Sequence, residues 1–247
     1  DSPMEADLLL DYLAYIIQYP HKQVTVHLIS YATRTKGAGR GSITRLVTKI
    51  LGAKLCNVNV DVDDFSGNFN DYVAKKLFLS IQEFAINGVG CQQRYNKLKN
   101  EMTNADDEII VNEKYMPPYY CYAAPHWFLH TNDVDAVPID ANERRFNVIR
   151  YSKSVSENMH TQRCYQDNVG SITDHMNDTL INDTSMLKCA YHYFNTRKIE
   201  TYQPHRVITK EAVLRASRDG ASTATMEFHE FIEGLGRDYY VNFEAPL

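Results

Sequence analysis

The sequence predicts an α/β protein of three layers, with helices on both faces of a parallel central sheet. Short β-branched and apolar runs alternate with helical patterns from Val24 to Ser152. Strands joined in this way need crossover connections, and crossovers force parallel pairing. The first run is followed directly by a glycine-bearing loop and then a helix, so the order is strand, loop, helix.

The first elements are indicated by apolar spacing and by residues that end helices. Met4–Pro20 repeats apolar residues at helical spacing and stops at a proline, which predicts an amphipathic lead-in helix. Val24–Ser30 is β-branched and typical of a strand. We expect the next helix over Ser42–Gly52, with the serine near its start and the glycine at its end.

The middle of the chain continues the alternation. We expect a strand at Leu55–Val62, a helix at Asn68–Lys75 and a strand at Lys76–Glu83, which together favour βαβ units. Cys91–Asn104 has a helical pattern, and Asp107–Ala123 alternates around a Pro-Pro break like a hairpin or two extended arms.

The remaining segments divide the chain into three expected parts. His126–Asn132 and Arg144–Ser152 are strand-like, and beyond them a polar segment precedes helical patterns at 185–199 and 225–235. The expected parts are a helical lead-in (1–22), an α/β core (23–152) and a mainly helical C-terminal subdomain (153–247).

Composition excludes several classes of protein. With 44% hydrophobic and 23% charged residues, the chain is neither disordered nor a coiled coil. A net charge of -5 excludes a surface that binds nucleic acid everywhere, although a local basic groove stays open. No apolar window approaches the roughly 18 residues of a membrane-spanning helix, so we expect a soluble intracellular protein without a membrane partner.

The loop after the first strand is the most informative feature. Gly37, Gly39, Arg40, Gly41 and Ser42 lie where a phosphate-binding loop would. Glycines let backbone N–H groups face an anion, and the following helix adds its dipole. The P-loop pattern GxxxxGK[ST] is not matched. A flexible turn that caps a helix therefore stays open as the alternative.

Polar residues at the ends of later strands strengthen the prediction of a phosphate-binding site. One strand is expected to end in Gln82-Glu83, and an acidic residue at such a strand end could hold magnesium or polarise an attacking water. Asn132 could orient water or contact a terminal phosphate. An arginine of the pair Arg144-Arg145 could stabilise charge that develops during phosphoryl transfer.

Four stretches carry a resemblance to a known family: HLISYATRTKGAGRGSITRLVTKILG, DFSGNFNDYVAKKLFLSIQE, LKNEMT with the later EKY, and FLHTNDVDAVPIDANERRF. They resemble the superfamily 3 helicase domain of phage, plasmid and large-DNA-virus primase-helicases, including phage primase-polymerases with a C-terminal helicase domain. The tail YHYFNTRKIETYQPHRVITKEAVL resembles the segment after that ATPase core.

This resemblance implies a P-loop, AAA+-like ATPase that uses ATP and Mg²⁺. Walker A would be the glycine loop with Arg40 and Ser42; Walker B would be Gln82 and Glu83, which with Ser42 would hold the metal. Asn132 would be sensor 1. The arginine finger would be Arg144 or Arg145, given to a neighbour in a homo-oligomeric ring that we expect to be a hexamer.

The resemblance also implies DNA partners. The hairpin IIVNEKYMPPYY would grip single-stranded or forked DNA, with Lys114 on phosphate and Tyr115 stacked on a base, and with Lys99 as a weaker candidate. The alternative is a solvated loop lysine beside a packed tyrosine. A primase or polymerase domain in the same full-length chain is expected, in the cytoplasm of a bacterial host or a virus-infected cell.

Two functions remain open. The first is an ATP-dependent DNA helicase/translocase module of a replication protein. The second is a nucleotide-binding but hydrolysis-impaired ring or scaffold subunit, which is favoured by Arg40 in place of lysine and Gln82 in place of an acid. Zinc at His126 and His130 and a reactive thiol at Cys91 are both disfavoured, the former because packing explains that spacing in a strand.

Overall fold

The computed structural model describes residues 3–32, 37–86, 90–103, 108–122, 125–132, 143–151, 177 and 181–209. Five strands form one sheet in the order β2-β3-β6-β1-β7, and every neighbouring pair is parallel. The strands are β1 (His27–Tyr31), β2 (Cys56–Asn57), β3 (Phe78–Ile81), β6 (His126–Thr131) and β7 (Phe146–Arg150). The predicted α/β class with a parallel sheet is confirmed.

Strand β1 lies between two strands that come much later in the chain. Ile29 of β1 faces Leu129 of β6 on one side and Val148 of β7 on the other. The connections that leave β1 and β6 cross the sheet in opposite directions, a topology that opens a crevice at the carboxyl ends of the strands. The segments that follow β1 and β6 therefore lie beside each other at one edge.

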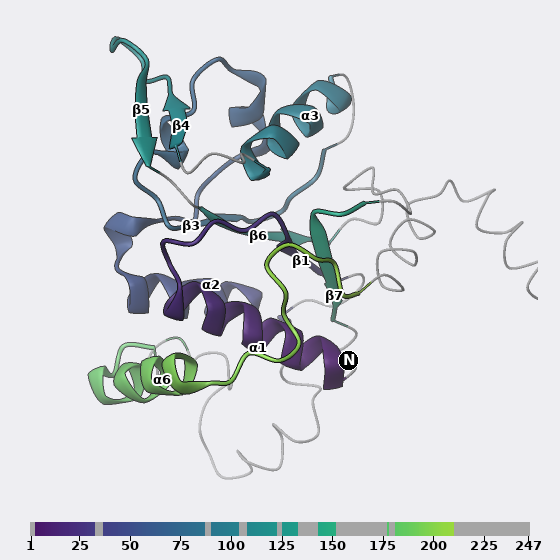
Figure 1. The fold of residues 1–247 in the computed structure, drawn as a ribbon, viewed down its shortest axis with the longest axis vertical. Helices are drawn as coiled ribbons and strands as arrows, with labels where there is room; N and C mark the ends of the chain where they lie inside the picture. Colours follow the sequence, from purple (N-terminus) through teal and green to yellow (C-terminus); the bar gives the residue numbers. More distant parts are fainter. Residues whose placement is uncertain are drawn as a thin grey trace, which may run out of the picture.

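Helices and loops cover both faces of the sheet (Figure 1). On one face lie α1 (Pro3–Gln18) and α2 (Arg40–Leu51), with α6 (Thr184–Thr196) packed outside them. The other face carries α3 (Cys91–Met102) and the hairpin of β4 (Glu108–Val111) and β5 (Tyr119–Tyr122). Of the two arrangements expected around the Pro-Pro break, a hairpin or two extended arms, the structure shows the hairpin.

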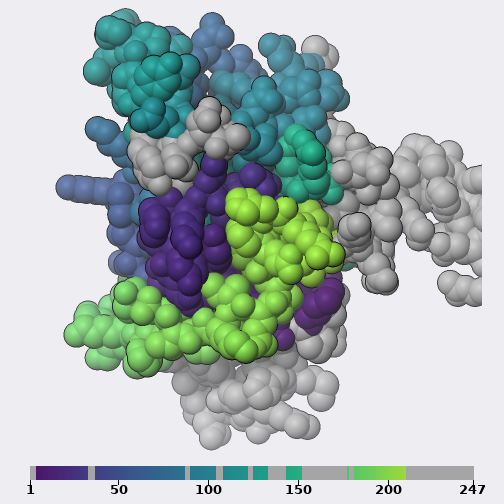
Figure 2. All heavy atoms as spheres, viewed as in Figure 1, coloured from purple at the N-terminus to yellow at the C-terminus, as the bar shows by residue number. Residues whose placement is uncertain are grey.

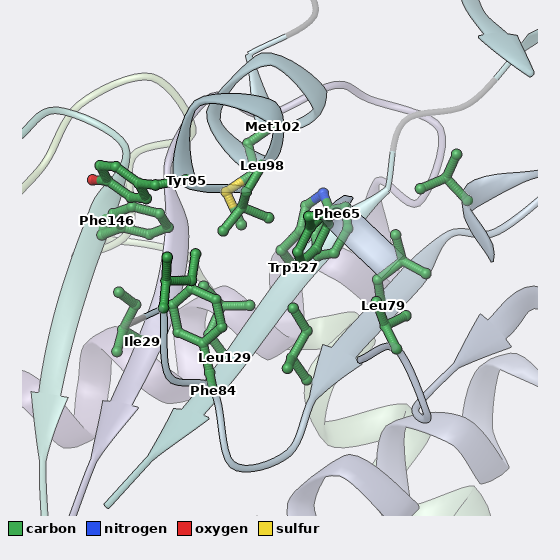
Figure 3. Close-up of a cluster of buried hydrophobic side chains, with 14 of the residues drawn as sticks. Ile29, Phe65, Leu79, Phe84, Tyr95, Leu98, Met102, Trp127, Leu129 and Phe146 are labelled. Carbon is green, nitrogen blue, oxygen red and sulfur yellow. The ribbon is translucent and has the colours of Figure 1, made fainter. Parts of the chain in front are cut away.

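Each face has its own buried core. Alternating residues of β6 point to opposite sides, so Phe128 packs with the α1 and α2 cluster while Trp127 and Leu129 pack under α3. Figure 3 shows Trp127 beside Phe65 within the second cluster, and their ring centroids are 6.1 Å apart. Both faces are thus largely apolar at the sheet centre, as expected of a parallel sheet that is covered on both sides, with buried polar side chains such as Ser30 and His130 among the apolar ones.

The segment between β2 and β3 differs from expectation. The predicted helix Asn68–Lys75 is wrong, because the chain forms 3₁₀ turns at Val62–Ser66 and Asp71–Val73 instead. Asp61 and Asp64 close a capping box around the first turn, which also ends the extended run. Only Cys56–Asn57 of the strand expected over 55–62 pairs with β3.

The described C-terminal segment folds back onto the core. The helix predicted at 185–199 is confirmed as α6, whereas the pattern at 225–235 lies outside the described residues. The Pro204 carbonyl accepts from the N–H groups of Thr25 and Val26, so the chain after α6 runs beside the start of β1. The expected division into three parts stays a prediction. None of the described helices combines the length and apolar character needed to cross a membrane.

Candidate functional site

The glycine loop leads into an uncapped helix start. Gly37 and Gly39 have φ of 73° and 79°, in the left-handed region that favours glycine. Gly39 is the N-cap of α2 and supplies no side-chain hydrogen bond, so the first N–H groups of the helix are not capped by it. A Cβ on Gly37 or Gly41 would meet nothing within 4 Å. Within the part of the loop that the structure describes (37–42), these N–H groups can therefore donate to an anion.

Arg40, the first residue of α2, reaches across to the end of β6. Its guanidinium donates to the Thr131 carbonyl at 2.8 Å and to the side-chain oxygen of Asn132. Burial lowers the pKa of Arg40, and the nearby Tyr151 opposes that shift. The structure thus brings together two of the predicted site residues, Arg40, which is expected in Walker A, and Asn132, which is expected as sensor 1. Among the described residues, no further partner takes the remaining guanidinium donors.

A buried relay lies beneath Arg40. His130 Nδ1 is 2.8 Å from Ser30 Oγ of β1, and its Nε2 is 2.9 Å from Thr44 Oγ1 of α2. Thr44 in turn donates to the Arg40 carbonyl at 3.2 Å. All three contacts form together when Ser30 donates to Nδ1 and neutral His130 donates from Nε2. Burial, with the charge of Arg40 second, lowers the pKa of His130 to about 3, so the ring stays neutral.

The relay was not foreseen from the sequence, although one signal pointed to it. Period-two alternation along β6 puts His126, Phe128 and His130 on the face toward α1 and α2. His126 packs edge-on against Tyr12 and Tyr15. Within the described residues no group of three or more His, Cys, Asp or Glu could hold a metal. His126 is therefore packed among aromatic rings, and His130 is hydrogen-bonded to Ser30 and Thr44.

Tyr151 was also missed. It follows β7 at the same carboxyl edge, and its N–H donates to the Tyr31 carbonyl at 2.8 Å. Its hydroxyl oxygen is buried and has no hydrogen-bond partner among the described residues. Burial raises the pKa of Tyr151 to about 12, so it is a neutral donor beside Arg40.

Ser42 lies in the first turn of α2 rather than at its cap. Its side chain is buried, and its hydroxyl donates to the side-chain oxygen of Asn177 at 2.9 Å. A serine hydroxyl at this place is a suitable magnesium ligand once that bond is exchanged. The magnesium site of Ser42, Gln82 and Glu83 stays a prediction.

Glu83 occupies a strained backbone position directly after β3. Its φ is 51°, a region that non-glycine residues rarely adopt. The next residue, Phe84, donates its N–H to the His130 carbonyl at 2.6 Å, which fixes the turn against β6. Gln82 donates to Ser80 Oγ at 3.0 Å. Strain of this kind, about 1–3 kcal/mol, clusters at functional sites.

Glu83 and Gln82 open into a cavity of about 480 Å³ at the ends of β2 and β3. Asp61, Asp63 and Arg94 also line it, and Arg94 lies 3.5 Å from Asp63. None of these three residues was singled out from the sequence. The cavity gives water and a ligand access to the Glu83 carboxylate.

Arg144 and Arg145 lie at the opposite edge of the sheet. The Arg145 carbonyl accepts from the N–H of His27, the first residue of β1, whereas the glycine loop follows the last one. The five-residue length of β1, roughly 16 Å, therefore separates the two sites. Arg145 pairs with Glu143 at 3.2 Å, while Arg144 is exposed.

The hairpin projects from the molecule and presents its tip to solvent. Figure 2 shows it as a knob at the top of the molecule, far from α6 at the bottom. Tyr115 is 91% exposed, with Lys114 Nζ 5.0 Å from its ring centroid. Lys99 lies apart from that tip, on α3, with its Nζ 4.4 Å from the Tyr95 ring.

Two asparagines join this hairpin to the 3₁₀ segment. Asn70 Nδ2 donates to the Ile110 carbonyl at 2.9 Å, and its Oδ1 accepts from the Asn112 N–H at 2.7 Å. Asn112 Nδ2 donates to the Asn68 carbonyl. The end of β4 next to the turn is therefore bonded to the 3₁₀ segment, whereas Tyr115 in the turn is exposed to solvent.

A protein-family model matches the middle of this chain. Residues 33–145 match the model of a family of unknown function (DUF5906). That range runs from the glycine loop to Arg145 and includes every site residue predicted above. The match covers less than half of the chain.

A curated relative is a phage primase-polymerase. The chain is 25% identical to the DNA Primase-polymerase of Nitratiruptor phage NrS-1 over 151 residues, which are 61% of this chain and 20% of that protein. An apo structure of the NrS-1 C-terminal region has a TM-score of 0.66 at 21% identity, and it covers 87% of this chain and 47% of that one. A second form gives a TM-score of 0.62. The fold is shared, and the chain spans about a fifth of the curated relative.

Proposed function

We propose that this chain is an ATP-dependent helicase or translocase module that works in phage-type DNA replication. The observation that carries the proposal is the junction of Arg40 with Thr131 and Asn132 beside an open glycine loop. The residues there fit the phosphates of a nucleotide, because uncapped N–H groups and a guanidinium with further donors face the same loop. Bound ATP and Mg²⁺ would supply the reacting phosphoryl group and its counter-charge.

Each remaining site residue has a role that its position supports. Glu83, strained and open to a cavity, would accept a proton from the attacking water. Asn132 would contact the terminal phosphate while it holds Arg40. Tyr151, with its buried free hydroxyl next to Arg40, would add one neutral donor.

The arginine finger is proposed to act between subunits of a ring. Roughly 16 Å of strand separates the arginines from the chain's own loop, so they can serve only a neighbour. Of the two residues, Arg144 is the better candidate, since Arg145 is engaged with Glu143. Ring size remains part of the proposal, with a hexamer expected.

The DNA contact is proposed for the hairpin tip. Lys114 can bind phosphate, and the exposed Tyr115 ring can stack on a base. Similarity to a primase-polymerase supports DNA as the partner and a primase or polymerase domain in the full-length protein. Lys99, on α3 and against Tyr95, would contribute less.

The second candidate is a ring or scaffold subunit that binds nucleotide without hydrolysing it. Arg40 anchored to β6 and Gln82 bonded to Ser80 favour this reading, because neither is placed as a lysine or an acid would be. The deciding experiment is a magnesium-dependent ATPase assay with and without single-stranded DNA, paired with calorimetric ATP titration. Turnover stimulated by DNA supports the helicase, binding without turnover supports the scaffold, and absence of ATP binding removes both.

A further inference from the structure

A second cavity, of about 460 Å³, lies between the hairpin and α3. Its walls are apolar at Val73 and Ile109 and polar at Asn100 and Glu101, and Tyr120 closes one side. The hairpin register pairs Tyr120 with Ile110 across the strands, on the outer face. Tyr120 is 72% exposed, so one face of its ring is accessible to a ligand.

The charges of this cavity do not suit a phosphate. Lys97 lines it, but its ammonium donates to the carbonyls of Asp64, Gly67 and Phe69 at 2.7–3.4 Å and so is directed into the protein. Glu101 and Glu108 add acidic character to the same walls. An uncharged, flat ligand with polar edges is therefore favoured over an anion.

Polar groups of the cavity can read such an edge. Both Glu101 oxygens are 2.7 Å from the Tyr72 hydroxyl, whose single proton leaves acceptor capacity on the carboxylate. Burial raises the pKa of Glu101 to about 7. Asn100, which is exposed, also lines the cavity and can bring its side-chain amide to a ligand. The cavity lining thus combines the Glu101 carboxylate and the Asn100 amide with the aromatic ring of Tyr120.

We propose that this cavity holds one base of a DNA strand that lies along the hairpin, with a preference over thymine for bases that carry an exocyclic amino group, such as adenine and cytosine. The inference rests on the proposed function and adds a base-reading pocket to it. Tyr120 stacks on the base, the Glu101 carboxylate accepts from its exocyclic amino group, and Asn100 contacts the ring edge. Thymine lacks the exocyclic amino group and so offers Glu101 no such donor in addition to the Tyr72 hydroxyl.

The test is a fluorescence anisotropy titration of this chain with labelled single-stranded oligonucleotides of equal length: oligo-dC, oligo-dA, oligo-dT and an abasic strand. We expect oligo-dC and oligo-dA to bind at least about fivefold more tightly than the abasic strand, and oligo-dT to lie between. Glu101→Gln should reduce the preference over oligo-dT, and Tyr120→Leu should reduce the preference over the abasic strand.

Matched variants control for folding and for general loss of affinity. Glu200→Gln and Tyr191→Leu change the same residue types at exposed positions elsewhere and should preserve both preferences. Tyr120 is exposed, so its variant should fold even if Glu101→Gln does not. Equal binding of all four strands, with both cavity variants unchanged, overturns the pocket but leaves DNA binding intact. No binding to any strand would instead refute the DNA contact itself.

Discussion

Arg40 and Asn132 are hydrogen-bonded to each other, and this bond ties the first residue of α2 to the first residue after β6. The two positions are 92 residues apart in sequence. A lysine has no planar fork and could not hold the Thr131 carbonyl and Asn132 in the same geometry. The arginine therefore does structural as well as electrostatic work at the candidate site.

Arg40→Ala should weaken ATP binding by about 1.5–3 kcal/mol, because a charged hydrogen-bond donor is lost. Arg40→Lys should retain nucleotide binding and preserve or raise turnover if the site is active, since a compact cation can enter among the phosphates. Calorimetric titration with ATP and magnesium measures both. Arg45→Ala, exposed on the same helix, is the matched control; three identical curves for wild type and the Arg40 variants would remove the phosphate-loop assignment.

Glu83→Gln should abolish ATPase activity while ATP affinity changes only a few fold, because the carboxylate acts on water and not on the ground-state phosphates. Glu83→Gly should also be inactive, yet its melting temperature should rise, since glycine relieves a strain of about 1 kcal/mol at φ 51°. Equal losses of binding and turnover in Glu83→Gln would contradict the role in activating water.

Lys114→Ala should weaken binding to every DNA sequence by a similar factor and reduce the slope of log affinity against log salt by about 1. Lys188→Ala, exposed on α6, should leave that slope unchanged. Anisotropy titrations at several salt concentrations measure it. An unchanged slope in Lys114→Ala would show that this ammonium does not meet a phosphate.

Stability should fall on mild acidification because of three buried histidines. Burial lowers the pKa of His27 to about 4 and the pKa values of His126 and His130 to about 3. The unfolded chain takes up these protons from about pH 6.5 downward, before the folded chain does, so the free energy of unfolding decreases as pH falls from about 6.5 toward 4. Denaturant midpoints across that range measure it, and His126→Phe should flatten the dependence.

Asp11→Asn should destabilise the packing of α1 against the chain after α6 by about 2–4 kcal/mol. Asp11 is 1% exposed and accepts from Arg197 Nε at 2.7 Å and from the N–H groups of Glu200 and Thr201. Asp7→Asn removes the other, half-exposed partner of Arg197 and should cost below about 1 kcal/mol. Thermal denaturation measures the loss of stability in the two variants. Equal losses would contradict the argument that the buried Asp11 carboxylate contributes more than the half-exposed Asp7.

Local patterns were sufficient for most of the fold. The β-branched runs and the glycine loop correctly predicted β1, α2, β3, β6 and β7, because parallel sheets need apolar strands and crossovers. The helix expected at Asn68–Lys75 failed, because the Asp61 capping box and the asparagine bonds to the hairpin outweigh weak helical spacing.

The candidate site was only partly accessible from sequence. Residues in or beside strand ends, such as Glu83 and Asn132, could be predicted from the order of strands and loops along the chain. The Ser30–His130–Thr44 relay could not, since each contact joins residues at least 86 positions apart. Tyr151 carries no sequence signal beyond its place after a strand.

The separation of the glycine loop from Arg144 across the sheet has a genetic consequence. If each active centre combines one chain's loop with another chain's arginine, two chains that are inactivated at different residues can restore activity when they assemble together. Mixed assemblies of Glu83→Gln and Arg144→Ala chains would contain some junctions in which an intact Glu83 meets an intact Arg144. Such complementation between inactive alleles cannot arise when all catalytic groups belong to a single chain.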